Sequence, residues 1–370
     1  MTRGWVVGRI AGAPVIVSPG WLVAAAVLTF LFAPTVRAAV PTLSEGAAYA
    51  VAALGAGLLF LSVFLHEVAH ALVARGRGVV VHELAVTLMG GHTRMGAAAP
   101  SPTASAVIAA AGPAANLALA AAGWFVAPML PPGGIAALLA TSVALTNGFV
   151  GVFNLLPGLP LDGGRVLEAL VWRLTGDRSK GTVAAAWVGR LLAVAVVGWL
   201  VLVPLAAGRS PDLTMIVWGA MIGAFLWSGA AQSLQAARAE QAVQRLSVRA
   251  LMSPARGVPA TGTLAHVDLN DATAPEVVLV EDDGRAVAYV DRSALAAVPA
   301  TAHALTPLHA VAVALPAGST IDVGLTGGEA VRAVGAAARH SPVIVVVDGP
   351  RGVVGLLRAQ DVISALRTGA

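Results

Sequence analysis

Long apolar runs separated by short polar segments dominate the first 240 residues of the chain. A helix needs about 20 consecutive apolar residues to cross the hydrocarbon core of a bilayer. Six runs are close to this length or longer: 17–35, 47–74, 103–129, 134–156, 184–207 and 213–234. The pattern therefore predicts a membrane α-helical bundle of about six transmembrane helices.

Two shorter segments of this region have the pattern of β-strands. Residues 4–17 alternate enough between apolar and polar positions to predict a short amphipathic hairpin at the membrane interface. Residues 79–95 predict a strand, a glycine turn and a second strand, and they are too short and too polar to span a bilayer.

Beyond residue 246 the pattern becomes that of a soluble α/β unit. Short β-rich runs alternate with helical stretches, the former at 276–280, 285–290, 343–347 and 352–357, the latter at 292–299, 327–340 and 359–367. The order strand, turn, strand, helix occurs twice, which indicates two copies of one unit. We therefore expect a membrane domain over 1–240 and a soluble pair over 241–370.

The composition is that of a membrane protein. Hydrophobic residues make up 57% of the chain and charged residues 11%, whereas soluble domains contain roughly a quarter charged residues. The absence of cysteine excludes thiolate metal sites and cysteine catalysis. The net charge of +4 comes from scattered arginines without interleaved aromatic residues, so we expect no nucleic-acid partner.

The basic residues also predict an orientation in the lipid bilayer. With the N-terminus in the cytosol, twelve basic residues fall in the inner segments and two, Arg37 and Arg209, in the outer loops. Basic residues accumulate on the cytoplasmic side of membrane proteins. Abundant Ala, Gly, Val and Arg are typical of a GC-rich bacterial genome. We expect a multi-pass protein of a bacterial cell membrane, with both termini and the soluble pair in the cytosol.

The second apolar run contains the sequence His66-Glu67-Val68-Ala69-His70. Two histidines four residues apart lie on one side of a helix, where both can bind one metal ion while the glutamate acts as a general base. Three ionisable residues inside an apolar helix are costly, and they indicate a function. A structural polar patch between helices, or a proton or ion path, is the alternative interpretation.

Asp162 is the strongest candidate for a third ligand, since catalytic zinc sites usually have three protein ligands. It follows the fourth apolar run in the segment NLLPGLPLDGGR. Pro157 and Pro160 interrupt the helix, and the two glycines after Asp162 allow close backbone approach. Irregular backbone at membrane depth is buried in protein or lines a wet cavity. The alternative is a helix-capping carboxylate at the membrane edge.

The HEVAH sequence together with NLLPGLPLDGGR resembles the site-2 protease family of intramembrane zinc metalloproteases, over about residues 1–240. The resemblance implies one Zn²⁺ per chain on His66, His70 and Asp162, with Glu67 as the catalytic acid and base. It also implies regulated intramembrane proteolysis, in which a peptide bond in or near the transmembrane segment of a single-pass membrane protein is hydrolysed.

Further positions match this family less specifically. Residues 112–116 (GPAAN) match a small-residue element of its third helix, and Asn154 matches an asparagine that the family places near the substrate backbone. We also expect Gly90 and Gly91, in the predicted hairpin, to pair with an extended substrate by strand addition. A plain interfacial hairpin is the alternative.

Two more histidines flank this glycine turn. His82 and His92 are candidate spare ligands for the metal. Interfacial polar positions are the alternative interpretation for both.

Residues 246–370 resemble the tandem CBS pair of a bacterial and archaeal branch of the family, chiefly in VRALMSP and GVVGLLRAQDVI. Such pairs often bind adenine nucleotides between their repeats. Arg358 occupies the place of the expected Ser or Thr three residues before Asp361, and the first repeat lacks the aspartate expected after YVDRS. Nucleotide binding, assembly of a homodimer through this pair and a structural role stay open.

Two other functions are compatible with parts of the sequence. A CBS-regulated transporter or channel would use the buried His, Glu and Asp side chains as an ion path. Such a protein is expected to show repeated halves with broken helices, which the sequence lacks. A proteolytically inactive relative could act as a binding or chaperone module, but the intact Glu67 argues against it.

Overall fold

The fold is that of a computed structural model, which describes residues 4–368 except 88–89, 97–98, 211 and 267–273. The chain forms two compact units, Met1–Gln235 and Ala236–Ala370. The boundary lies inside helix α7 (Leu213–Arg245). The boundary predicted at residue 240 falls within the same helix.

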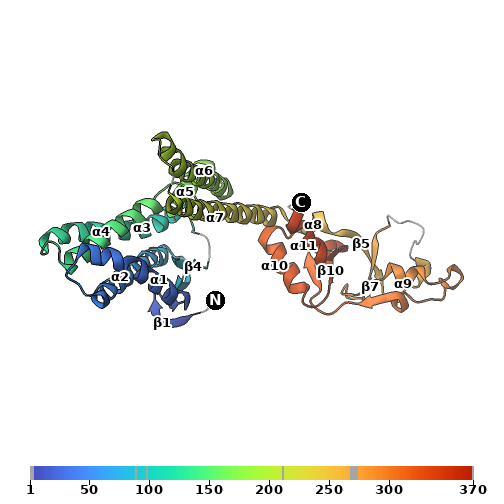
Figure 1. The fold of residues 1–370 in the computed structure, drawn as a ribbon. Coiled ribbons are helices and arrows are strands. Elements are labelled where there is room, and N and C mark those ends of the chain that lie inside the picture. Colours follow the sequence, from blue (N-terminus) through green and yellow to red (C-terminus); the bar gives the residue numbers. More distant parts are fainter. Residues whose placement is uncertain (1–3, 88–89, 97–98, 211, 267–273, 369–370) are drawn as a thin grey trace. The chain divides into compact units, whose positions relative to one another are not determined.

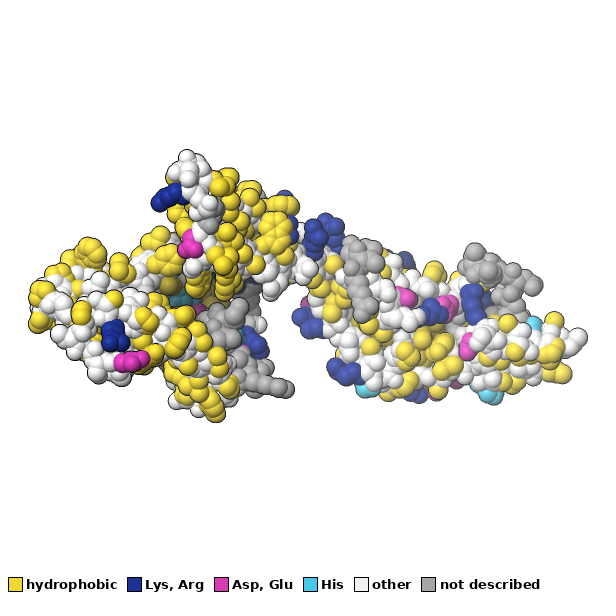
Figure 2. All heavy atoms as spheres, viewed as in Figure 1, with side chains coloured by type: hydrophobic (Ala, Val, Ile, Leu, Met, Phe, Trp, Pro, Cys, Tyr) yellow, Lys and Arg dark blue, Asp and Glu magenta, His cyan; other side chains and the backbone are white. Residues whose placement is uncertain are grey.

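The first unit is built mainly of long apolar helices (Figure 1). They are α1 (Gly20–Ala39), α2 (Glu45–Gly76), α3 (Pro102–Val126), α4 (Ile135–Asn154), α6 (Arg178–Ala206) and α7. By length and composition, six helical segments of the described chain could cross a membrane. Hydrophobic side chains cover much of the visible face of these helices (Figure 2). Phe125 and Trp199 are 72% and 63% exposed, as expected for side chains that face lipid.

The segment between α4 and α6 leaves the regular helical pattern, as its prolines predict. A loop follows Asn154, and the short amphipathic helix α5 (Asp162–Thr175) then begins at Asp162 itself. The loop is anchored on α6, because the backbone N–H of Leu159 donates to the carbonyl of Ala185 at 3.0 Å. Its position therefore determines where Asp162 lies.

Glycines allow this loop to pack tightly against two helices. A Cβ atom added to Gly189 of α6 would lie 2.0 Å from the carbonyl oxygen of Leu159, and one added to Gly229 of α7 would lie 2.4 Å from the Pro160 ring. Both distances are far below van der Waals contact. Leu161, the residue before Asp162, is buried in a cluster with Ala193 and Leu226 of the same two helices.

We expect Gly189→Ala to destabilise the first unit by about 1–3 kcal/mol, because its methyl group would push the backbone of Leu159 away. The measurement is the thermal unfolding midpoint of the protein in detergent micelles. Gly198→Ala on the same helix is the matched control, since its nearest heavy atom would be 4.0 Å away. Equal midpoints for the two variants would contradict the prediction.

The two predicted hairpins form one four-stranded sheet. The strands are β1 (Trp5–Ile10), β2 (Ala13–Val17), β3 (Val81–Thr87) and β4 (Gly90–Met95), in the order β1-β2-β3-β4. The parallel pairing of β2 with β3 joins residues that lie far apart in the chain, with Val15 opposite Leu84. Both side chains pack against Ala71 and Ala74 of α2. The sheet is thereby fixed beside the helix that carries the HEVAH sequence.

The second unit has a seven-stranded sheet in the order β8-β7-β6-β5-β11-β10-β9. The predicted repeat is present as β6, β7 and α9, then β10, β11 and α11. Three of the strands, β5, β8 and β9, lie outside the β-rich runs that the sequence predicts. The bounds are α8 (Val248–Leu251), β5 (Ser253–Pro259), β6 (Glu276–Val280), β7 (Ala286–Val290), α9 (Arg292–Ala296), β8 (Ala312–Ala314), β9 (Thr320–Asp322), α10 (Gly327–Ala337), β10 (Val343–Asp348), β11 (Gly352–Arg358) and α11 (Ala359–Thr368).

Candidate metal centre

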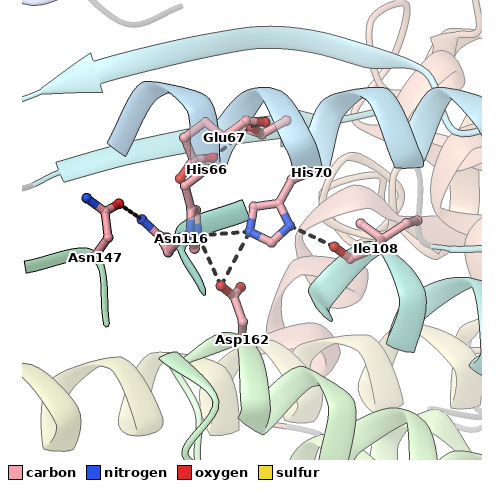
Figure 3. Close-up of polar contacts among 8 residues, drawn as sticks. His66, Glu67, His70, Ile108, Asn116, Asn147 and Asp162 are labelled. Atoms are coloured by element: carbon pink, nitrogen blue, oxygen red, sulfur yellow. Dashed lines mark hydrogen bonds and ion pairs between the residues drawn. The ribbon is translucent and has the colours of Figure 1, made fainter. Parts of the chain in front are cut away.

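Two buried histidines and a half-buried aspartate, from two helices, converge on one point in the first unit (Figure 3). His66 and His70 lie one turn apart on α2, and their Nε2 atoms are 3.0 Å apart. The Oδ2 atom of Asp162, the first residue of α5, lies 3.1 Å from Nε2 of His66 and 3.3 Å from Nε2 of His70. The structure thus brings together the three side chains that the sequence analysis selected as ligands.

The other ring nitrogen of each histidine is held by an oxygen atom. His66 Nδ1 lies 2.5 Å from Oδ1 of Asn116, and His70 Nδ1 lies 2.7 Å from the carbonyl oxygen of Ile108. Because these oxygens can only accept, each Nδ1 carries the proton and donates it. In a neutral ring Nε2 then presents its lone pair. Two nitrogen lone pairs and a carboxylate then face each other, an arrangement that a shared cation would stabilise.

The donor set fits a metal ion of the zinc type. Zinc prefers nitrogen and oxygen ligands in tetrahedral geometry, with bonds of about 2.0–2.1 Å, which separates neighbouring ligand atoms by roughly 3.3 Å. The distances of 3.0, 3.1 and 3.3 Å between the three ligand atoms are close to this value. Among the residues that the structure describes, these three form the group of His, Asp and Glu side chains that could hold a metal ion.

Gly112 of α3 leaves the space that such an ion needs. A Cβ atom added to Gly112 would lie 2.4 Å from Nε2 of His70 and 2.5 Å from Nε2 of His66. The missing side chain therefore opens the helix surface at the point where the two nitrogens meet. In the sequence, Gly112 stands out only as part of the small-residue element at 112–116.

Glu67 lies beside this group and is itself 8% exposed. Thr93 of β4 donates its hydroxyl proton to Oε2 of Glu67 at 2.7 Å, and the same hydroxyl oxygen lies 3.2 Å from the Glu67 carbonyl oxygen. A Cβ atom added to Gly91 would lie 2.5 Å from Cγ of Glu67 and 3.0 Å from its Oε1. Strand β4 therefore holds one carboxylate oxygen and leaves room at the other.

The remaining predicted site residues lie outside the group of three ligands. Gly90 begins β4 with a φ of 115°, a conformation that favours glycine. Asn154 is the half-buried last residue of α4. His92 lies 3.6 Å from the buried carboxylate of Glu83, and His82 packs against Gly96. Neither histidine belongs to the group that could hold a metal.

Several residues that support the site were not selected from the sequence. Thr93 contacts Glu67 directly, Asn147 contacts Asn116, and Ser62 contacts Asn147. Ser62 and Asn147 are polar residues within apolar runs, at 5% and 1% exposure. A polar residue within an apolar run is the available signal, because a polar group buried among helices needs a hydrogen-bond partner.

Comparison with known proteins places this arrangement in a family. Residues 54–141 and 130–197 match the model of Peptidase family M50. The chain is 37% identical over 282 residues to a protein of Mycobacterium tuberculosis named as zinc metalloprotease Rip3, covering 74% of this chain and 66% of that protein. It is 31% identical over 252 residues to one named as zinc metalloprotease sll0528 of Synechocystis, covering 67% and 64%.

One solved structure is also similar. The site-2 protease from Methanocaldococcus jannaschii is 24% identical, with a TM-score of 0.43, and the match covers 62% of this chain and 94% of that one. The present chain thus matches slightly less than two thirds of the length of the two relatives above.

The fold and the site define a helical membrane protein with a buried side-chain group that could bind a metal ion. The family match makes this class specific. The chain belongs to Peptidase family M50, whose relatives found here are named as zinc metalloproteases. The resemblance to site-2 proteases that the sequence predicted is confirmed.

Proposed function

We propose that this protein is an intramembrane zinc endopeptidase. His66, His70 and Asp162 hold one zinc ion, and Glu67 is the general base. The observation that carries the proposal is the convergence of three acceptor atoms within 3.3 Å of one another, next to a buried glutamate. Both histidines have their Nδ1 atoms engaged elsewhere, so their Nε2 atoms are available for the ion.

Each residue of the site has a separate role in peptide-bond hydrolysis. A bound zinc ion supplies Lewis-acid activation of the attacking water and of the scissile carbonyl. Glu67 accepts the proton of the water and delivers it to the leaving amine. Thr93 holds Oε2 of Glu67, which leaves Oε1, beside Gly91, for proton transfer. The hydrogen bonds to Asn116 and Ile108 keep both imidazole rings in the required orientation.

Strand β4 supports a binding mode for the substrate. It is the last strand in the order of the described sheet, and Gly91 and Thr93 on it contact Glu67. An extended polypeptide that pairs with β4 would therefore pass beside the general base. We infer that Gly90 and Gly91 contact the substrate backbone, and we keep Asn154 as a further candidate contact.

The substrate class follows from the surroundings of the site. The site lies in the unit that is built of six apolar helical segments, so we infer that the substrate reaches it within the lipid bilayer. A substrate helix must unwind before its carbonyls can be attacked, because they are hydrogen-bonded in the helix. A single-pass membrane protein can unwind locally with little loss of packing. We infer that such proteins are cleaved in or near their transmembrane segments.

We also infer the orientation of the chain and a role for the second unit. The bias of basic residues supports a multi-pass protein with both termini in the cytosol. The repeated α/β order supports a tandem CBS pair that regulates the protease. Arg358 donates hydrogen bonds to both carboxylate oxygens of Glu276, at 3.0 and 3.3 Å, and its guanidinium group is therefore already engaged. This ion pair argues against adenine-nucleotide binding through Arg358 and leaves a homodimer contact or a structural role for the pair.

The proposed function is tested with the full chain in proteoliposomes together with a single-pass reporter protein. We expect cleavage of the reporter to stop after zinc is removed with a chelator and to return when zinc is added. Asp162→Asn should bind zinc weakly and regain no cleavage. Asp212→Asn, at the exposed start of α7, is the matched control and should behave as wild type. Cleavage that survives zinc removal would contradict the proposal, and ion flux without cleavage would favour a transporter.

A further inference from the structure

A continuous chain of buried hydrogen bonds leads away from the metal centre through three helices. It runs from His66 Nδ1 to Oδ1 of Asn116 at 2.5 Å, then from Nδ2 of Asn116 to Oδ1 of Asn147 at 2.8 Å (Figure 3). Nδ2 of Asn147 donates to Oγ of Ser62 at 3.0 Å, and Ser62 donates to the carbonyl oxygen of Leu58 at 2.9 Å. The two asparagine residues are 1% exposed and Ser62 is 5% exposed.

Each link of this chain determines the direction of the next. Ser62 has one hydroxyl O–H, which donates a hydrogen bond to the Leu58 carbonyl, so its oxygen accepts a hydrogen bond from Asn147. The second N–H of the Asn147 amide donates a hydrogen bond to the Val143 carbonyl at 3.0 Å. Both amide protons are then used, and Oδ1 of Asn147 can only accept from Nδ2 of Asn116.

The consequence reaches the metal centre. With its NH₂ group turned toward Asn147, Asn116 presents Oδ1 to His66. This carbonyl oxygen accepts a hydrogen bond from the Nδ1–H group, which places the His66 lone pair on Nε2, the atom that faces Asp162 and His70. If Asn116 turned over, its NH₂ group would face Nδ1, and the lone pair would move to the wrong side of the ring.

We propose that Asn147 and Ser62 are positioning residues, which fix the orientation of the Asn116 amide and thereby the tautomer of His66. This inference rests on the proposed zinc site and deepens it. His70 has no comparable need, because a backbone carbonyl, that of Ile108, cannot turn over. His66, which is held by a side-chain amide, is thus the histidine whose partner has further hydrogen-bond partners.

The alternative is that these groups only hold α2, α3 and α4 together. Polar side chains often stabilise contacts between membrane helices modestly. Such a role would change stability but would not depend on which atom of Asn147 accepts. The test must therefore separate the stability of the helix bundle from the direction of the hydrogen bonds.

The test uses two near-isosteric variants of the full chain in detergent micelles. Asn147→Leu removes the acceptor for Asn116, whereas Asn147→Asp keeps an acceptor whether its carboxyl group is ionised or protonated. We expect zinc affinity, measured by chelator competition, to fall about 10- to 100-fold in the leucine variant. The aspartate variant should stay within a few-fold of wild type.

A serine pair provides the matched control for simple helix contacts. Ser62 and Ser142 both donate to the carbonyl four residues earlier, at 2.9 and 2.8 Å, but only Ser62 accepts a bond from Asn147 in the described structure. We expect Ser62→Ala to weaken zinc binding several-fold and Ser142→Ala to leave it unchanged. The thermal unfolding midpoints of the zinc-free proteins report the structural contribution of each serine.

A spectroscopic measurement tests the inference without any metal. In ¹⁵N-histidine spectra of the zinc-free protein, assigned by comparison with His66→Ala, Nδ1 of His66 should carry a proton in wild type and in Asn147→Asp. It should lose that proton in a measurable fraction of Asn147→Leu molecules. An unchanged Nδ1 signal and an unchanged zinc affinity in the leucine variant would overturn the inference, as would equal weakening in both Asn147 variants.

This design keeps the two proposals apart. If wild type binds no zinc at His66, His70 and Asp162, the proposed function fails, and the ¹⁵N spectra still decide the role of Asn147. If wild type binds zinc there and Asn147→Leu retains both the affinity and the Nδ1 proton, the proposed function stands and the positioning role is refuted.

Discussion

Replacement of Glu67 by glutamine is expected to lower the rate of peptide-bond cleavage by about 10²- to 10⁴-fold, the usual contribution of a general base. Glutamine has nearly the same shape and can still accept the hydrogen bond of Thr93 through its amide oxygen. It cannot take a proton from water at neutral pH. Because Glu67 is not part of the ligand group, zinc content should stay at one ion per chain.

The measurement is reporter cleavage in proteoliposomes together with metal content of the same preparations. Glu45→Gln is the matched control, since Glu45 is an exposed carboxylate in the first turn of the same helix. It should cleave as wild type does. Wild-type rates from the Glu67 variant would remove Glu67 from the reaction, and loss of zinc from it would mean that the carboxylate supports the metal instead.

The long helices of the first unit could be predicted largely from hydropathy, because a helix that crosses a lipid bilayer needs about 20 mostly apolar residues. The HEVAH sequence could be placed on a helix for the same reason. Asp162 could be selected since Pro157, Pro160 and the following glycines indicate irregular backbone at membrane depth. The structure then brings its carboxylate within 3.3 Å of both imidazoles.

The long-range contacts could not be predicted in this way. The pairing of β2 with β3 depends on tertiary contacts between Val15, Leu84 and α2, which no local pattern encodes. Helix α7 continues to Arg245, whereas the apolar run ends at 234. Its last turns are rich in Ala, Gln, Glu and Arg, which favour helix without being apolar. Hydropathy therefore identified the candidate membrane segment but not the end of the helix.

The residues that support the ligands could not be predicted from the sequence either. A polar residue inside an apolar run signals a buried partner, but the sequence does not say which one. Asn147 and Asn154 lie two turns apart on α4, and the family resemblance selected Asn154. The structure gives Asn147 the hydrogen bond to Asn116. Gly112 likewise shows its importance only through the two imidazoles that approach it.

Gly112→Ala is the second substitution with a large expected effect, namely loss of zinc below the detection limit. The added methyl group would lie 2.4–2.5 Å from Nε2 of His70 and of His66, so both rings must move away by roughly 1 Å to reach ordinary contact. Metal sites tolerate ligand displacements of only about 0.2 Å. The two histidines and Asp162 can then no longer bind one ion together.

The higher helix propensity of alanine should stabilise α3, so a loss of zinc from Gly112→Ala would not reflect a loss of helix. Alanine favours a helix by about 1 kcal/mol over glycine, so the zinc-free protein should keep its fold unless the clash spreads through α3. Gly57→Ala on α2 is the matched control, because nothing lies within 4 Å of the added atom. Both variants are compared by metal content and by thermal unfolding without zinc. A Gly112→Ala protein that holds one zinc ion per chain with wild-type affinity would show that the ion lies elsewhere, since no ion held by both Nε2 atoms can coexist with that methyl group.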